Sequence, residues 1–238
     1  MTPEPVIVWT RPERGARGPA ALHSRGELAA VAVELADAKG LSAVSMRQVA
    51  KELGTGQASL YRYLSSRDDL LDLMADMVTG QIDLGVPLGG DPVEDLLALA
   101  ARTKRVHLEH PWLSDIPPEP LRLGPRGLDY LEYALHALAP TALSGRTKME
   151  VVALMNALIA QFARAELQRG RTDTDRRQAQ AAYLGTAAAQ GDRPHLAAAM
   201  ADAATAGQAG TDPAQDPDPL FTRTMRRALT ALVESGPR

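Results

Sequence analysis

The sequence predicts an all-α fold, and three observations support that prediction. Apolar residues recur three and four positions apart along most of the 238 residues, which is the spacing of amphipathic helices. Serine, aspartate, glycine and proline stand where such segments begin and end. No stretch alternates apolar and polar residues in the way that half-buried strands do. We therefore expect a chain of helices without a sheet.

The first helix is expected to begin after Ser24. Ser24 and Glu27 stand three residues apart in the pattern of a capping box, which satisfies two free backbone N–H groups. Lys39 and Gly40 indicate the C-terminal end of this helix. Its apolar side is expected to form a small core with the two helices that follow.

Residues 45–64, SMRQVAKELGTGQASLYRYL, predict two short helices joined by a tight glycine turn. Ser45 and Gln48 form a second capping box, and Gly54 stands where the end of a helix takes a left-handed conformation. The second helix begins at about Gln57. This arrangement is typical of a helix-turn-helix, whose second helix enters the major groove of DNA.

The polar residues of the second helix are of types that contact DNA. Gln57 and Ser59 lie at its N-terminus, where base edges would lie, and an amide can pair bidentately with adenine. Hydroxyl and guanidinium groups are typical donors to phosphate. The donors that follow are Tyr61, Arg62, Tyr63 and Arg67. A small helical bundle with merely solvated polar faces is the alternative.

The stretch from Gly40 to Leu71 resembles the DNA-binding domain of the TetR family of transcriptional repressors. The resemblance rests on the glycine-leucine opening, the S-M-R-x-V-A-x-E-L-G helix, and L-Y-x-Y followed by a basic residue and D-x-L. It implies that Arg47 contacts a base or phosphate and that Gln57 reads a base. Thr55 is expected to cap the second helix or to touch DNA. The residues at phosphate-contact positions of the family are Ser59, Tyr61, Tyr63 and Arg67.

This sequence departs from the family at one point. The family often has histidine where Arg62 or Tyr63 stands, so the resemblance supports contacts there less strongly than at Gln57.

Composition limits the classes of protein that the chain can belong to. There is no cysteine, which excludes a disulfide framework, a thiolate nucleophile and thiolate metal ligands. We find no secretion signal, and the longest apolar run, residues 151–160, is interrupted by Asn156 and too short to span a bilayer. A cytoplasmic protein is expected. The net charge of −3 is unevenly distributed, with about +1 in residues 1–70 and −4 in the rest.

Residues 1–19 hold four prolines and show no helical period, so we expect a flexible basic arm. The arm either reaches DNA, as homeodomain arms do, or is a solvated tail. Residues 6–9 are too apolar for a pure tail and are expected to pack against the body of the protein.

The remaining helices are predicted by the same signals. Ser66 with two aspartates, and Asp91 with Pro92, mark two strong N-termini. The expected helices are 67–78, 92–109, 128–138, 146–169, 173–190, 194–200 and 221–232, with loops near 84–91, 117–125 and 206–219. The H-P-W sequence at residues 110–112, with the proline-broken segment after it, resembles the C-terminal domain of a tetracycline-repressor-like subgroup.

Candidate ligand-binding residues lie on the expected helices after residue 90. His107 and His110 stand three positions apart, but no further metal ligands accompany them, so no metal centre and no cofactor are predicted. Asn156 lies in an apolar helix, where a buried amide needs a partner. The candidates are Thr103, His107, His110, Trp112, Asn156 and Ile159. Each has the alternative of being an ordinary core residue.

We therefore predict a flexible arm in residues 1–19, a DNA-binding domain in 20–66, and a ligand-binding and dimerisation domain in 67–238. The resemblance implies a homodimer that represses transcription from a palindromic operator and releases it when a small apolar molecule binds. Helix 173–190 and the last helix resemble the dimer interface of the family. The alternatives are an all-α enzyme, for which no catalytic motif is found, and a protein-interaction module. The sequence does not identify the effector, the operator or the regulated genes.

Overall fold

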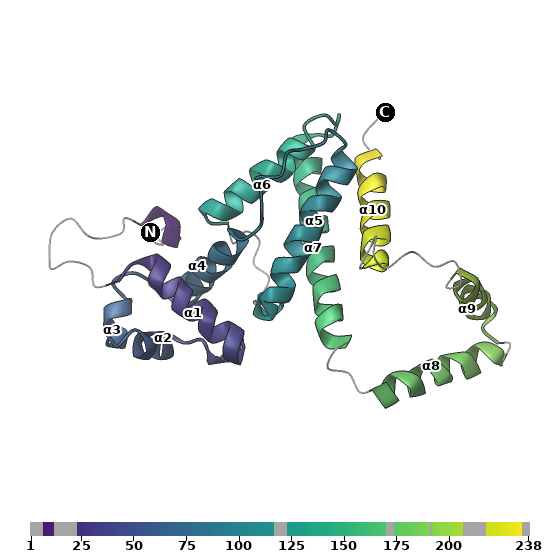
Figure 1. Cartoon of the computed structure of the whole chain (residues 1–238), viewed down its shortest axis with the longest axis horizontal. Helices are drawn as coiled ribbons and strands as arrows, with labels where there is room; N and C mark the ends of the chain where they lie inside the picture. Colours follow the sequence, from purple (N-terminus) through teal and green to yellow (C-terminus); the bar gives the residue numbers. More distant parts are fainter. Residues whose placement is uncertain are drawn as a thin grey trace, which may run out of the picture. The chain divides into compact units, whose positions relative to one another are not determined.

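The computed structural model of the chain describes residues 7–11, 23–116, 123–169, 174–190, 192–206 and 218–234. All regular structure in these residues is helical, as predicted (Figure 1). The chain forms two compact units, Met1–Arg164 with Met225–Arg238, and Ala165–Thr224. The predicted boundary between residues 66 and 67 lies inside the first unit and stays a prediction.

The N-terminal helices are α1 (Arg25–Lys39), α2 (Met46–Glu52), α3 (Gln57–Leu60) and α4 (Arg67–Thr79), with short 3-10 turns η1 (Val8–Thr10) and η2 (Leu41–Ala43). They are followed by α5 (Pro92–Glu109), η3 (Pro111–Asp115), α6 (Pro125–Ala137) and α7 (Gly145–Arg169). The last helices are α8 (Thr174–Ala189), α9 (Pro194–Ala206) and α10 (Pro219–Glu234). No helix among the described residues is long and apolar enough to cross a membrane.

The ends of α1 and α2 form largely as the sequence predicts. The capping box of Ser24 and Glu27 is complete, with both hydrogen bonds present. Ser45 accepts from the backbone N–H of Gln48 at 3.2 Å, but the Gln48 side chain donates to Glu52 instead of returning to Ser45, so only half of the second box forms. Gly54 takes the expected positive φ of 65° between α2 and α3.

The second helix of the motif is shorter than expected. α3 ends at Leu60, and the chain continues to Leu64 through backbone hydrogen bonds of mainly three-residue spacing. The small core forms as predicted around fully buried Leu28, Val49 and Leu60. This core fixes the angle at which α3 stands in the N-terminal helices.

The N-terminus of α6 is stabilised by a residue that the sequence does not point to. α6 begins at Pro125 without a cap of its own, and the Asp76 carboxylate of α4 accepts from the backbone N–H groups of Arg126 and Gly127 at 3.0 and 2.9 Å. Gly124 permits this close approach, because a Cβ there would collide with the Asp76 carboxylate. A tertiary contact thus replaces the usual local cap.

The leucines that predicted α6 do not form its most buried face. Leu128 is 56% exposed and Leu138, just after the helix, is fully buried, whereas Tyr130, Ala134 and Ala137 are buried within the helix. The leucines recur three and four positions apart along the edge of the buried face, where small alanines allow α6 to pack closely against its neighbours.

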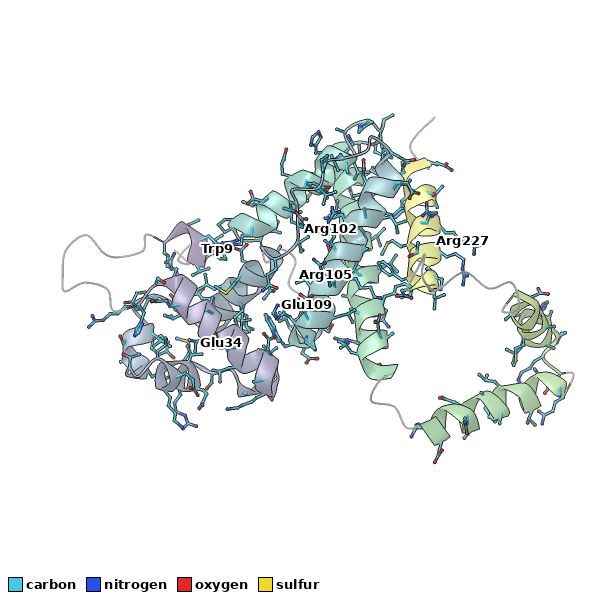
Figure 2. The ribbon with its side chains drawn as sticks, in the orientation of Figure 1. Trp9, Glu34, Arg102, Arg105, Glu109 and Arg227 are labelled. Carbon is cyan, nitrogen blue, oxygen red and sulfur yellow. The ribbon has the colours of Figure 1, made fainter. Side chains whose placement is uncertain are left out.

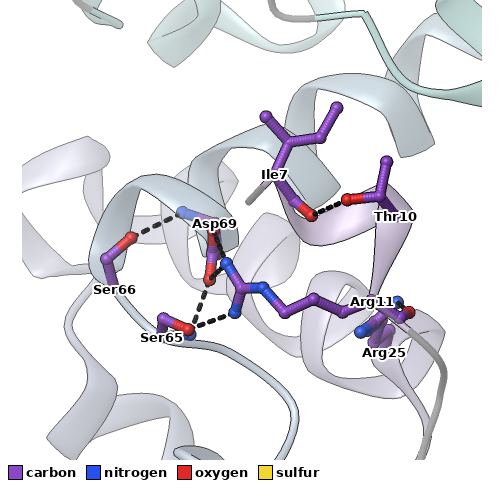
Figure 3. Close-up of polar contacts among 7 residues, drawn as sticks. All are labelled: Ile7, Thr10, Arg11, Arg25, Ser65, Ser66 and Asp69. Atoms are coloured by element: carbon purple, nitrogen blue, oxygen red, sulfur yellow. Dashed lines mark hydrogen bonds and ion pairs between the residues drawn. The ribbon is translucent and has the colours of Figure 1, made fainter. Parts of the chain in front are cut away.

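Residues 7–11 were predicted to belong to an arm with no folded element, and the structure differs from this prediction. They form the turn η1, with Val8 completely buried, which confirms that part of this apolar segment packs against the body. Arg11 makes an ion pair with Asp69 of α4, with one guanidinium nitrogen 3.0 and 2.9 Å from the two carboxylate oxygens, and its other terminal nitrogen donates to Ser65 (Figure 3). Arg25 of α1 donates to the backbone oxygen of Arg11 at 3.1 Å. The rest of the predicted arm lies outside the described residues.

The later helices agree with the prediction except in length. α7 begins and ends within a residue of the predicted 146–169, and α8 closely matches 173–190. α9 continues to Ala206 instead of ending at residue 200, because its alanine-rich sequence favours helix without interruption. The predicted loop at 206–219 falls mostly outside the described residues.

Candidate functional site

The predicted DNA-contacting face is largely accessible. Arg47, Gln57, Tyr61 and Arg62 are exposed on α2, on α3 and in the turn after α3, and Thr55 and Ser59 are half-buried. Gln57 and Tyr61 stand one helical turn apart, and the Gln57 amide donates to the Tyr61 hydroxyl at 3.4 Å. This contact restricts the side-chain conformations of the residue predicted to read a base.

Two of the predicted phosphate donors also support the domain itself. Tyr63 is buried, and its hydroxyl accepts from the backbone N–H of His23 at 3.4 Å. The Arg67 guanidinium donates to the carbonyl oxygens of Val44 and Leu41, both at 3.3 Å, although the side chain is exposed. Any contact of these residues with DNA would be additional to this structural role.

A cavity of about 230 Å³ lies among the helices that follow the helix-turn-helix. Its wall combines residues from α4, α5, η3, α6 and α7. The lining residues are Thr79, Ile82, Thr103, Val106, His107, Leu113, Leu123, Gly127, Tyr130 and Asn156. Three predicted ligand residues, Thr103, His107 and Asn156, are therefore brought together. Mostly apolar walls with a few polar groups are typical of sites for small molecules.

Two polar side chains of the cavity wall could not be identified from the sequence. Tyr130 lies on the buried face of α6, and Thr79 closes the last turn of α4. A correct assignment of the buried face of α6 would have found Tyr130, since a buried tyrosine hydroxyl usually has a partner. No signal in the sequence singles out Thr79.

The buried polar groups of the wall are held in uncharged forms. The Tyr130 hydroxyl donates to the Asn156 side-chain oxygen at 2.6 Å, so the predicted amide has its partner. Burial raises the pKa of Tyr130 to about 12, and the nearby side chains of Thr103, Asn156 and Arg102 oppose this shift more weakly. Burial also lowers the pKa of His107 to about 4, because a charged imidazole would lose its hydration.

Three other predicted ligand residues do not line the cavity. Ile159 is fully buried as an ordinary core residue. His110 and Trp112 instead bind Asp37 of α1, with the His110 Nδ1 and the Trp112 indole nitrogen at 2.8 and 2.7 Å from the same carboxylate oxygen. The other ring nitrogen of His110 lies 2.9 Å from the side-chain oxygen of Gln81, just after α4. We name Asp37, Gln81, His110 and Trp112 the Asp37 cluster.

The Asp37 cluster and the cavity wall have two segments of chain in common. Gln81 stands between the wall residues Thr79 and Ile82. His110 and Trp112 stand between wall residues His107 and Leu113. A displacement of the segment from His107 to Leu113 therefore moves groups that are bonded to Asp37 of α1, and a displacement of the segment from Thr79 to Ile82 moves Gln81, which is bonded to His110.

The fold agrees with the comparisons with known proteins. Residues 28–74 match the family described as "Bacterial regulatory proteins, tetR family". Residues 87–214 match "Tetracyclin repressor-like, C-terminal domain", which is more than half of the chain. The chain belongs to the TetR family. It is a transcriptional regulator with a DNA-binding helix-turn-helix, as the resemblance implied.

Two transcriptional regulators resemble the chain over most of its length. It is 33% identical to the HTH-type transcriptional repressor DrrR1 of Streptomyces coeruleorubidus over 204 residues, which are 82% of this chain and 76% of that protein. It is also 33% identical to an HTH-type transcriptional regulator of Saccharopolyspora erythraea over 195 residues, 81% of each chain.

Solved TetR-family structures share the fold. The structure of the Streptomyces coelicolor protein ActR in complex with (S)-DNPA has a TM-score of 0.71 at 25% identity and covers 92% of this chain and 100% of that one. BioQ with its natural double-stranded DNA operator has a TM-score of 0.51 at 15% identity and covers 62% of this chain and 89% of that one, which shows the likeness of the fold alone.

Proposed function

We propose that this regulator is a repressor that binds a palindromic operator as a homodimer and releases it when a small uncharged molecule occupies the cavity. The observation that carries the proposal is that the cavity wall and the Asp37 cluster share the same two chain segments. Through them, the occupancy of the cavity can affect the position of α1, and with it the helix-turn-helix.

The DNA-binding half of the proposal rests on the exposed residues of α2, α3 and the turn after α3. Arg47, Gln57, Tyr61 and Arg62 combine an amide suited to a base edge with groups that donate to phosphate. ActR, which shares the fold, was solved with small molecules bound, and BioQ was solved with its operator. The same two kinds of partner are proposed for this chain.

Two links would couple the cavity to the DNA-binding helices. The first is the Asp37 cluster, which joins α1 to η3 and to the end of α4. The second is Asp76 of α4, which caps α6 beside the wall residue Gly127. A ligand that fits the cavity better when these links are displaced would shift the population away from the DNA-binding conformer.

The homodimer is proposed because one helix-turn-helix reads only a half-site. Two copies related by a two-fold axis would read a palindrome with its half-sites one helical turn, or a multiple, apart. Tyr183 and Leu184 on α8 and Leu220 on α10 are exposed apolar side chains, which is consistent with the predicted use of these two helices in an interface.

The other two classes considered from the sequence have less support. Regulators of this family are generally DNA-binding proteins and not enzymes, which disfavours an all-α enzyme. A protein-interaction module would not need the enclosed polar groups of the cavity.

The test is selection of bound sequences from a random DNA library with the purified full-length chain at a stated salt concentration. We expect one palindromic sequence to be enriched and a dimer to be seen by light scattering. If no sequence is enriched and the affinity falls steeply as the salt concentration rises, the protein contacts only phosphates, which would contradict specific binding of an operator.

A further inference from the structure

The hydroxyl groups of the cavity wall already donate their hydrogen bonds to acceptors within the protein. Thr79 donates to the carbonyl oxygen of Ala75 at 2.8 Å, and Thr103 donates to that of Leu99 at 2.9 Å, in each case one turn back along its own helix. The Tyr130 hydroxyl donates to Asn156. Since a hydroxyl has one hydrogen, these groups can offer a bound molecule only the lone pairs of their oxygens.

The two other polar side chains of the wall, Asn156 and His107, are also uncharged and have atoms available for a bound molecule. The Asn156 side-chain oxygen accepts from Tyr130, which leaves its NH₂ group as a donor to a bound molecule. The Nδ1 atom of His107 is buried and has no hydrogen-bond partner among the described residues. With its lowered pKa, the imidazole is neutral at pH 7.

No lysine, arginine, aspartate or glutamate is among the residues that line the cavity in the described part of the chain. Arg102 lies on α5 close to this region (Figure 2), but its guanidinium stands over the Tyr133 ring and donates to the Tyr133 hydroxyl at 3.1 Å. An ammonium group in the cavity would lose its hydration without an opposite charge, and a carboxylate would meet only the charge of Arg102, which lies outside the wall and has the smallest effect on the pKa of Tyr130, so both are costly to bury.

We propose that the effector is an uncharged molecule that carries a hydroxyl group, in the chemical class of phenols and alcohols. Its hydroxyl hydrogen is donated to the wall oxygen of Thr103, and its oxygen accepts from the Asn156 amide. An ether or a hydrocarbon of the same shape lacks the hydrogen, and a carboxylate lacks both the hydrogen and a counter-ion in the wall. This inference rests on the proposed function, since it assumes that the cavity is the effector site.

Three probes of one shape test this chemistry. An apolar cavity of roughly 150 Å³ accommodates a benzene ring, so a cavity of about 230 Å³ suits a two-ring probe. The probes are 2-naphthol, 2-methoxynaphthalene and 2-naphthoate, titrated into the full-length chain by calorimetry at pH 7.5. We expect 2-naphthol to bind about tenfold or more tightly than either of the other probes. This difference in affinity corresponds to the net free energy of about one hydrogen bond.

Variants of one threonine show whether the wall oxygen is responsible. Thr103→Val should reduce the affinity for 2-naphthol about tenfold and leave 2-methoxynaphthalene unchanged, while Thr103→Ser should retain the affinity. The matched control is Thr186→Val on α8, because Thr186 donates to the Ala182 carbonyl in the same way but does not line the cavity. This control should leave all three affinities unchanged.

Several outcomes would overturn the inference. Equal binding of 2-methoxynaphthalene would show that no donated hydrogen is needed, and tighter binding of 2-naphthoate would show that the site selects anions. Failure of all three probes to bind would also reject it, as would a Thr103→Val variant that binds 2-naphthol normally. None of these results affects the operator selection, so a wrong effector class can be distinguished from a wrong regulatory function.

Discussion

The helix-turn-helix and the cavity are stabilised in different ways. In the N-terminal helices, the ends of α1 and α2 are held by residues close in sequence, such as Ser24 with Glu27 and Ser45 with Gln48, beside a closed apolar core. Around the cavity, polar contacts join residues far apart, such as Asp76 with Gly127 and Asp37 with Trp112. Local caps and a closed core hold α3 in one position, whereas polar contacts beside a cavity can be rearranged by what occupies it. This difference suits one region to recognition and the other to regulation.

The largest expected effect is on the small core of the first region. Replacing fully buried Leu60 with alanine should lower the free energy of unfolding by about 2–5 kcal/mol, because it removes apolar contacts and leaves a cavity. Chemical denaturation measures this change, and Leu128→Ala, at an exposed site, is the control, with a change within about 0.5 kcal/mol. Similar losses for both variants would show that the assigned core is wrong.

A specific effect is expected at Gln57. Gln57→Ala should reduce discrimination at one base position by about 1–3 kcal/mol, since the amide would no longer pair with that base. Affinities for the selected operator and its single-base variants measure the change, and Gln48→Ala on α2 serves as a control on the same domain. A uniform loss on all sequences would mean that Gln57 contacts only phosphate.

The Asp37 cluster joins the two regions, and breaking it should have a moderate effect. Asp37→Ala should cost about 1–3 kcal/mol of the free energy of unfolding, because the Trp112 indole N–H is buried without an acceptor. It should also change operator affinity and reduce the release caused by 2-naphthol. Glu34→Ala is the control, as Glu34 is exposed on the same helix (Figure 2).

If Asp37→Ala lowers stability but leaves both operator affinity and release as in the unaltered chain, the cluster is only structural. That result would assign the coupling to the Asp76 link alone.

The smallest expected effect concerns Asp76 and its pH dependence. Asp76→Ala removes the cap of α6 and should cost about 1 kcal/mol, whereas Asp76→Asn keeps an acceptor and should be nearly neutral at pH 7. Burial raises the pKa of Asp76 above 3.8, so the folded state binds the proton more tightly than the unfolded state. Its contribution to stability therefore decreases as pH rises from 3.8 through the raised pKa.

Denaturation of the original chain and the Asp76→Asn variant between pH 3.5 and pH 7 measures this contribution. The difference between the two should change in favour of the asparagine variant as pH rises. A difference that is constant over this range would show that the carboxylate is ionised without cost.

Much of the fold could be predicted from the sequence because helix ends are local. Ser24, Gly54 and Asp91 each mark an end by a side chain or a glycine within a few residues, and the structure confirms all three. The core face of α6 could not be predicted in this way. Its leucines and its small residues both recur at helical spacing, and only packing against other helices decides which of them are buried.

The same distinction between local motifs and distant contacts applies to the candidate site. The sequence by itself determined the all-α class, the helix-turn-helix and the family, because these depend on short motifs with fixed spacing. It also singled out Thr103, His107 and Asn156, which the cavity brings together. Only the tertiary structure decided that His110 and Trp112 bind Asp37 of α1 and that Asp76 caps a distant helix. Those partners are separated by about fifty residues or more, and no local pattern records which of many polar groups will meet across packed helices.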